Sequence, residues 1–282
     1  MFWRPATRSG RRFVIRWNRH SVWVCLGFLL ATPAGAIDRG ADGKFEHRSS
    51  AHFELYQDVD IDRAGGFRGT RHFEQQILAE LESAYDRLDD YLGLRPKRRI
   101  EVVIYDAGIF DQQCAGAFRF AAAGFYHGVI RIRGATELDV NLSRVLHHEL
   151  VHAALDAAAP TYTLPAWLNE GLAEWFEART QGKRHLNARE QAILSGAKSN
   201  GALFSFATLS TPSFGHLESD AAYLAYLQSY GMVEFLVSRR GERSLREFCD
   251  RLMRTRNLER SLKHVYRDHM DALAAQFVAE LG

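Results

Sequence analysis

The segments VLHHELVHAAL (residues 145–155) and LPAWLNEGLAEW (residues 164–175) decide how this chain is expected to fold. The first places His148 and His152 four residues apart, so on a helix both imidazoles lie on one face and can bind one ion. Glu149 adjoins the first histidine, where its carboxylate can reach a metal-bound water without binding the metal. This segment alone leaves open a second interpretation, two exposed histidines on an ordinary helix.

The second segment supplies a third ligand. A catalytic zinc needs three protein ligands and one open position for water. Glu170 is predicted to be that ligand, placed by a loop that turns the chain back, and one Zn²⁺ per chain is expected. Apolar residues on either side of Glu170 indicate a helix that packs inward: Trp167, Leu168, Leu172 and Trp175.

Two further residues of the second segment are expected to support the ligands from outside. Glu174 lies one helical turn after Glu170 and could accept the free N–H of a ligating imidazole, which would fix its tautomer and orientation. Asn169 is assigned to the same supporting group. His147 points about 100° away from His148 on the helix, so it is expected to pack or to lie at the surface.

Over the rest of the chain, hydrophobic periodicity predicts an α+β protein. Before residue 140 the pattern favours a strand, a helix, a strand and a pair of short strands (52–57, 70–92, 99–105, 118–133). After it the pattern is helical (141–158, 165–178, 187–195, 221–239, 244–254, 258–281). We therefore predict an N-terminal mixed α/β lobe with a small twisted sheet (37–140), a C-terminal helical lobe that carries both segments (141–282), and an active-site cleft between them.

The first 36 residues are predicted to be a secretory signal peptide. Six arginines precede an apolar run from Val22 to Ala31, and Ala34-Gly35-Ala36 offers a cleavage site of small residues. Export to the periplasm or the extracellular space is therefore expected. An uncleaved membrane anchor is the alternative, although the run is shorter than the roughly 20 residues that spanning requires.

The charge balance, the apolar segments and the cysteines of the chain indicate which partners and cross-links are expected. The whole chain has 36 basic and 34 acidic residues, and loss of the arginine-rich leader changes its net charge from +2 to −4. A nucleic-acid partner is not indicated. No second segment is long and apolar enough to span a membrane after leader cleavage. Cys114 and Cys249 remain after the leader and could form one disulfide in an oxidising compartment.

The His-Glu-x-x-His motif at 148–152, followed by Asn-Glu-Gly-x-Ala at 169–173, resembles the gluzincin clan of metallopeptidases, which includes thermolysin and the alanyl aminopeptidases. The closer resemblance is to the bacterial peptidase MA-like domain proteins of that clan. It extends over most of the mature chain, including the hairpin at 124–132 and the stretch Tyr226–Tyr230. The 17 residues between His152 and Glu170 are slightly fewer than in the best-known members, and the Gly-x-Met-Glu-Asn signature of the aminopeptidases is absent.

The resemblance implies a zinc-dependent metallopeptidase acting on a peptide or protein substrate, with Glu149 as the catalytic base, and the leader adds export. A tyrosine hydroxyl would stabilise the oxyanion. Tyr230 is favoured over Tyr226 by position. In that clan an edge strand holds the substrate extended, and the hairpin ending at Ile132 is the candidate.

Three other interpretations stay open. The first is a zinc-binding envelope scaffold that no longer cleaves, which the intact Glu149 disfavours. The second is a zinc amidase acting on a non-protein substrate such as peptidoglycan, because the motif chemistry does not choose among carbonyl substrates. The third is a helical interaction module that binds no zinc.

Overall fold

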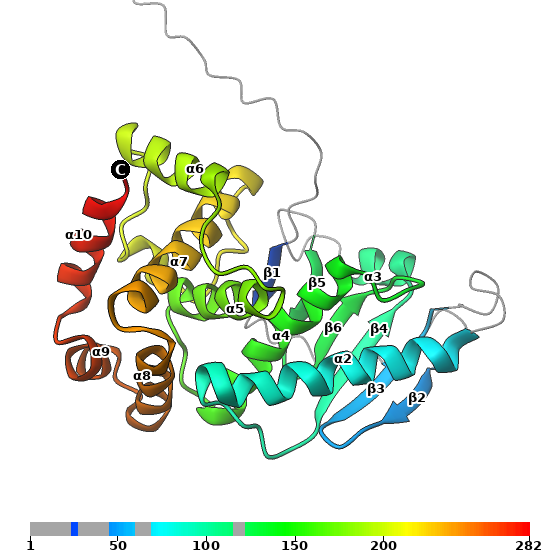
Figure 1. Cartoon of the computed structure of the whole chain (residues 1–282). Helices are drawn as coiled ribbons and strands as arrows, with labels where there is room; N and C mark the ends of the chain where they lie inside the picture. Colours follow the sequence, from blue (N-terminus) through cyan, green and yellow to red (C-terminus); the bar gives the residue numbers. More distant parts are fainter. Residues whose placement is uncertain (1–23, 28–44, 60–68, 115–121) are drawn as a thin grey trace, which may run out of the picture.

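The computed structural model describes residues 24–27, 45–59, 69–114 and 122–282 (Figure 1). The predicted cleavage site after Ala36 and most of the predicted leader lie outside these ranges. Four leader residues, Val24–Gly27, form the short strand β1. Within the described ranges, no helix has the length and apolar character needed to cross a bilayer.

The sheet of the N-terminal half is mixed, with the strand order β1-β5-β6-β4-β3-β2. The remaining strands are β2 (Glu46–Ser49), β3 (Phe53–Gln57), β4 (Ile100–Tyr105), β5 (Ala122–Tyr126) and β6 (Ile130–Arg133). β3, β4 and β6 run parallel, whereas β2 and β5 run antiparallel to their neighbours β3 and β6. Alternate residues of β4 are β-branched and buried, which is the pattern of a strand with one face on the core.

Helices cover the sheet and then build the second half of the molecule (Figure 1). α2 (Gly69–Leu92) and α4 (Val140–Ala158) contact the sheet, and α3 (Ala107–Cys114) follows β4. The later helices are α5 (Ala166–Thr180), α6 (Ala188–Ser199), α7 (Ser219–Arg240), α8 (Glu242–Thr255), α9 (Leu258–Tyr266) and α10 (Met270–Glu280), with a short 3₁₀ turn at Thr208–Ser210. The predicted α+β class is confirmed.

The structure differs from the predicted elements at the C-terminus. One helix was expected over 258–281, but two are present, because Arg267 adopts a left-handed conformation (φ 64°) and ends α9. β1, β2 and α3 were not predicted as a strand, a strand and a helix. Each is short or weakly patterned, so periodicity gives little signal for it.

Cys249 is a free thiol that is wholly buried in α8, and burial raises its pKa to about 12. A thiol in that state is unreactive, because only the thiolate attacks or is readily oxidised. Cys249 therefore does not form the disulfide that the sequence allowed.

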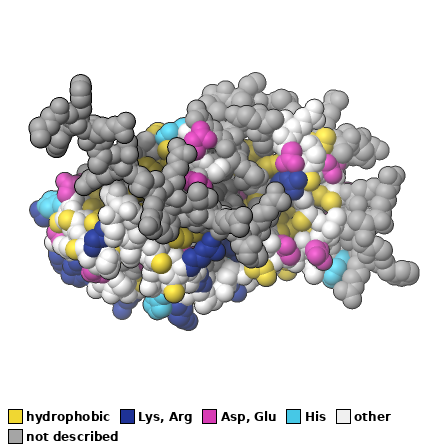
Figure 2. All heavy atoms as spheres, turned by 90° about the horizontal axis from the view of Figure 1, so that it is seen from above, with side chains coloured by type: hydrophobic (Ala, Val, Ile, Leu, Met, Phe, Trp, Pro, Cys, Tyr) yellow, Lys and Arg dark blue, Asp and Glu magenta, His cyan; other side chains and the backbone are white. Residues whose placement is uncertain are grey.

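Exposed apolar surface is sparse. Among the described residues, Val140 is the large hydrophobic residue with high exposure. On the face seen in Figure 2, hydrophobic side chains are interspersed with charged and other groups rather than gathered in one patch. Most apolar side chains of the described residues are instead buried in one core that runs from the sheet into the helices.

Gly171 sets how closely α5 and α7 pack. A Cβ atom at this position would lie 2.6 Å from the backbone oxygen of Ser229 and 2.9 Å from Val233 Cγ2. Gly171→Ala should therefore lower the free energy of unfolding by about 1–3 kcal/mol, because the added carbon forces the two helices apart. Denaturant unfolding monitored by circular dichroism would measure it.

Gly196 in α6 is the matched control, since a Cβ there meets nothing within 4 Å. Gly196→Ala should leave stability unchanged or raise it by up to about 1 kcal/mol, because alanine is the better helix former. Equal effects of the two substitutions would contradict the close approach at Gly171.

Candidate metal centre

α4 carries the two histidines of the first segment in the middle of a buried stretch. Its N-terminus is capped by the Asp139 side chain, which accepts a hydrogen bond of 2.8 Å from the Leu142 amide. The helix is then buried almost continuously from Leu142 to Leu155. His148, Glu149 and His152 are 1%, 0% and 3% exposed, so the exposed-histidine interpretation is wrong.

α5 brings Glu170 against these histidines. Pro165 is the N-cap residue, and the Ala166 amide donates to the Thr211 carbonyl at 2.9 Å. The apolar residues that predicted an inward-packed helix are all fully buried: Trp167, Leu168, Leu172 and Trp175. Together with the close contact at Gly171, this packing buries the carboxylate of Glu170, which is 1% exposed.

The three donor atoms have the spacing of a zinc site. Glu170 Oε2 lies 3.3 Å from Nε2 of His148 and 3.3 Å from Nε2 of His152. Two donors of a tetrahedral zinc, each about 2.0–2.1 Å from the ion, are about 3.3–3.4 Å apart. One ligand atom from each of the three residues falls within a mutual distance of 4.8 Å. The residues present therefore fit Zn²⁺.

Two polar atoms of this ligand set also lack a hydrogen-bond partner within the described part of the protein. Glu170 Oε1 and His152 Nε2 are buried and have no hydrogen-bond partner among the described residues. Burial opposes ionisation of Glu170, but the two histidines outweigh it and lower its pKa. Burial likewise opposes protonation of His148, and the carboxylates of Glu170 and Glu177 raise its pKa well above the usual range. Buried polar groups of this kind are normally paired or coordinated to a metal.

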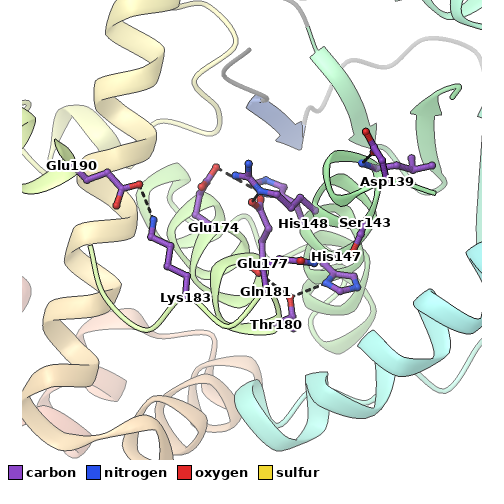
Figure 3. Close-up of polar contacts among 12 residues, drawn as sticks. Asp139, Ser143, His147, His148, Glu174, Glu177, Thr180, Gln181, Lys183 and Glu190 are labelled. Carbon is purple, nitrogen blue, oxygen red and sulfur yellow. Dashed lines mark hydrogen bonds and ion pairs between the residues drawn. The ribbon is translucent and has the colours of Figure 1, made fainter. Parts of the chain in front are cut away.

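The Nδ1 atoms of both imidazoles, on the side of each ring away from Glu170, lie close to oxygen atoms of α5. His152 Nδ1 lies 3.2 Å from Oδ1 of Asn169, a residue that the sequence assigned to the supporting group. His148 Nδ1 lies 3.4 Å from Glu177 Oε2 and 3.9 Å from Glu174 Oε1. Figure 3 shows both carboxylates on α5 directed toward His148. Contacts of this kind fix the tautomer of a ligating histidine and the orientation of its ring.

Glu177 is the residue that sequence reasoning missed. It is buried, and it also accepts a hydrogen bond from Arg144 Nε, so its carboxylate is held from two sides. Burial and the neighbouring Glu177 raise the pKa of Glu174 to about 7. Glu177 stands seven residues after Glu170, two turns along the same helical face, and this spacing is the signal that could have found it.

Glu177→Gln should weaken zinc binding by about 10- to 100-fold, because His148 would lose the carboxylate nearest to its outer nitrogen. Glu174→Gln should have the smaller effect, in line with its longer distance. Competition with a chromophoric chelator would measure both affinities. Glu247→Gln on the exposed surface of α8 is the control, and equal losses in all three variants would contradict the assignment.

His147 faces away from the ligands, as its position on the helix predicts, and it is fully buried. Its Nδ1 lies 2.7 Å from Thr180 Oγ1 (Figure 3). Its Nε2 lies 3.0 Å from Glu80 Oε1. The hydrogen bond from His147 lowers the pKa of Glu80 to about 2. This contact joins α4 to α2 and α5 beneath the candidate metal centre.

The two predicted oxyanion tyrosines lie on α7. Tyr230 is buried, its hydroxyl has no hydrogen-bond partner among the described residues, and Lys183 Nζ lies 4.6 Å from its ring centroid. The Tyr226 ring packs edge-on against Phe214 at 5.4 Å. Neither lines the cleft beside the ligands, whereas Tyr126 and Tyr162 do.

That cleft is a cavity of about 330 Å³ with His152 and Asn169 in its wall. The other walls come from the β5–β6 turn, the last turn of α4, the loop at 161–164, Pro212 and Met253. The candidate metal centre therefore opens between the sheet and the helical half. A substrate lying in the cleft would pass directly beside one of the predicted ligands.

Comparison with known proteins adds a family and a fold. A family model described as the Peptidase MA superfamily matches residues 81–281, which include every candidate ligand. The structure of native yeast LTA4 hydrolase is similar, with a TM-score of 0.51 and 15% sequence identity. That match covers 83% of this chain but 38% of the hydrolase, so this chain spans less than half of its length. No curated protein matches the chain.

Proposed function

Since this chain belongs to the Peptidase MA superfamily, we propose that it is a zinc-dependent metallopeptidase that hydrolyses peptide bonds. The observation that carries the proposal is the convergence of His148 Nε2, His152 Nε2 and Glu170 Oε2 at the spacing of zinc ligands, beside a cleft. Glu149 adjoins the first of these ligands and is wholly buried. A purely structural zinc site has no use for a base in that position.

The chemistry divides between the ion and the chain. Zinc held by His148, His152 and Glu170 would lower the pKa of a water molecule and polarise the scissile carbonyl. Glu149 is the group that accepts the proton of the attacking water and returns it to the leaving amine. Asn169 and Glu177 keep the two imidazoles oriented, so the ligand set does not have to rearrange during the reaction.

We assign the second oxyanion donor to a tyrosine. Tyr230 and Tyr226 are the candidates by position in the family, and Tyr162 is a third because it lines the cleft beside His152. Burial raises the pKa of Tyr230 and of Tyr162. Their hydroxyls therefore keep the proton at neutral pH and can donate it in a hydrogen bond to a developing oxyanion.

An extended substrate can be placed along β5, which contacts α4. The outer side of β5 pairs with β1, in register Val24 with Ala122 and Gly27 with Tyr126. β1 belongs to the predicted leader. Signal-peptide cleavage after Ala36, with export to the periplasm or beyond, would therefore remove β1 and free the β5 backbone to pair with a substrate strand.

The test is metal removal and restoration on the purified protein. One Zn²⁺ per chain is expected by elemental analysis. Hydrolysis of an unfolded protein and of a mixed peptide library should stop after chelation and return with one equivalent of Zn²⁺ but not Mg²⁺, which prefers oxygen ligands. Zinc without hydrolysis of any peptide would favour the silent zinc-binding scaffold. Cleavage of murein fragments alone would favour the amidase.

A further inference from the structure

A second cavity adjoins the cleft at the end of the sheet where β4 begins. It measures about 840 Å³ and lies between the segment Arg95–Glu101 and the last turns of α4. Tyr126, Gly128 and Asp156 line both this cavity and the cleft. We call it the basic cavity, defined by Arg95–Glu101 together with Ala153, Asp156 and Ala157.

The walls of the basic cavity carry an excess of positive charge. Four cationic residues, Arg95, Lys97, Arg98 and Arg99, come from one short segment, against the two carboxylates of Glu101 and Asp156. Two of the cations are already paired outside the segment. Arg95 Nη2 lies 3.0 Å from Asp89 Oδ2, and Arg99 Nη1 lies 2.5 Å from Glu54 Oε1.

Lys97 and Arg98 differ from their neighbours, because neither has an acidic partner among the described residues. Both side chains are exposed at the cavity wall. An unpaired lysine beside an unpaired arginine is a recognition element for a carboxylate, and arginine can bind it through two parallel N–H groups.

The segment that bears them is held firmly from both ends. Leu94 is buried, and the Tyr85 hydroxyl donates to the Pro96 carbonyl at 2.6 Å. The Ile100 amide donates to the His52 carbonyl at 2.8 Å, which starts β4. A segment fixed in this way presents its cations without a large ordering cost when a ligand binds.

The boundary between the two cavities is the contact of Tyr126 with Asp156. The Tyr126 hydroxyl donates to Asp156 Oδ2 at 2.7 Å. Asp156 follows the candidate ligand His152 by one turn of α4, about 6 Å along the helix. An extended peptide advances about 3.3 Å per residue, so a chain crossing this boundary reaches the basic cavity about two to four residues from the scissile bond.

We propose that the basic cavity is a remote substrate subsite that binds a carboxylate, with Lys97 and Arg98 as its specificity-determining residues. The inference rests on the proposed peptidase function of the adjoining cleft. The carboxylate can belong to an acidic side chain or to the C-terminus of the substrate. Glu101 and Asp156 moderate the local charge, which favours a singly charged carboxylate over a more highly charged phosphate.

Matched peptides test the proposal on the zinc-loaded enzyme. One series carries Glu or Gln at each of the positions two to four residues from the scissile bond, and a second ends in a free or an amidated C-terminus. The enzyme should favour the carboxylate by about tenfold in kcat/KM, mainly through KM, because this contact serves binding rather than chemistry. The series that shows the preference identifies the source of the carboxylate.

The double substitution Lys97→Gln/Arg98→Gln should reduce the carboxylate-to-neutral ratio of kcat/KM to about one. Lys97→Glu/Arg98→Glu should bring the ratio below one, because the substrate carboxylate would then meet negative charge. The control is Arg254→Gln/Arg260→Gln, which removes the same charge outside the basic cavity and should keep the ratio. No preference in the wild type, or one that survives in both Lys97/Arg98 variants, overturns the proposal.

Direct binding separates this proposal from the peptidase assignment. Calorimetric titration of the wild-type chain with a Glu-containing peptide and its Gln counterpart needs no turnover. Preferential binding of the Glu peptide that is lost in Lys97→Gln/Arg98→Gln supports the subsite even if no peptide is cleaved. Equal binding of the two peptides, together with hydrolysis, refutes the subsite while the peptidase function stands.

Discussion

Glu149→Gln should retain one zinc per chain and lose peptide hydrolysis by about 10²- to 10⁴-fold in kcat, the range that a positioned general base contributes. The substitution keeps the shape of the side chain and removes its basicity. The ligands His148, His152 and Glu170 are untouched, and glutamine fills the same fully buried position. The loss should therefore appear in kcat, with little change in zinc affinity or in folding.

Three measurements on one preparation check this result: zinc per chain, the free energy of unfolding, and kcat on a peptide that the wild type cleaves. Glu247→Gln is the matched control, because it makes the same chemical change at an exposed position on α8 and should keep full activity. Wild-type turnover in Glu149→Gln would remove Glu149 from the role of base. Loss of zinc in that variant would instead place Glu149 among the ligands.

Glu170→Ala should abolish stoichiometric zinc binding and, with it, all hydrolysis. The carboxylate of Glu170 contacts both histidine Nε2 atoms at 3.3 Å, and its removal leaves two neutral ligands for a dication in a buried site. Two imidazoles alone do not complete the three-ligand set of a catalytic zinc. Dialysis against buffered Zn²⁺ followed by elemental analysis would measure the loss, with circular dichroism to show that the chain is folded.

The same variant distinguishes two ligand sets. His148, Glu174 and Glu177 also bring three donor atoms within 4.8 Å of one another, so an ion could in principle lie on the outer side of His148. Zinc retained in Glu170→Ala but lost in Glu177→Gln would place the ion in that outer set. The opposite pattern would place it between the two helices, where the cleft reaches it.

Much of the candidate site is encoded locally and could be predicted. The spacing of His148 and His152 is a property of one helix, and no tertiary contact is needed to put four-apart residues on one face. Glu170 was identified because a helix with buried tryptophans around it must face inward. Asn169 was assigned to the supporting group on the same segment, and it lies against His152.

The choice between Glu174 and Glu177 could not be predicted, because it depends on how α5 crosses α4. Both residues lie on the side of α5 that faces α4. Glu174 lies 3.9 Å and Glu177 3.4 Å from His148 Nδ1. A small rotation of α5 about its axis would be enough to reverse which of the two is nearer. Two contacts help to fix the orientation of α5: the close approach of α7 at Gly171 and the hydrogen bond from Arg144 to Glu177. Neither contact has a sequence signature, since each joins segments far apart in the chain.

The fold divides in the same way. Hydrophobic periodicity determined α2, β3, β4, α4 and α5, because these are long or strongly patterned elements whose buried face repeats at 3.6 or 2 residues. The tertiary structure decided the break at Arg267, the isolation of Cys249 and the meeting of Lys97 and Arg98 with the end of α4. The sequence by itself thus determined which residues could bind a metal and which faces are buried. Which of them meet was decided by packing between distant segments, because local periodicity carries no information about the angle at which two helices cross.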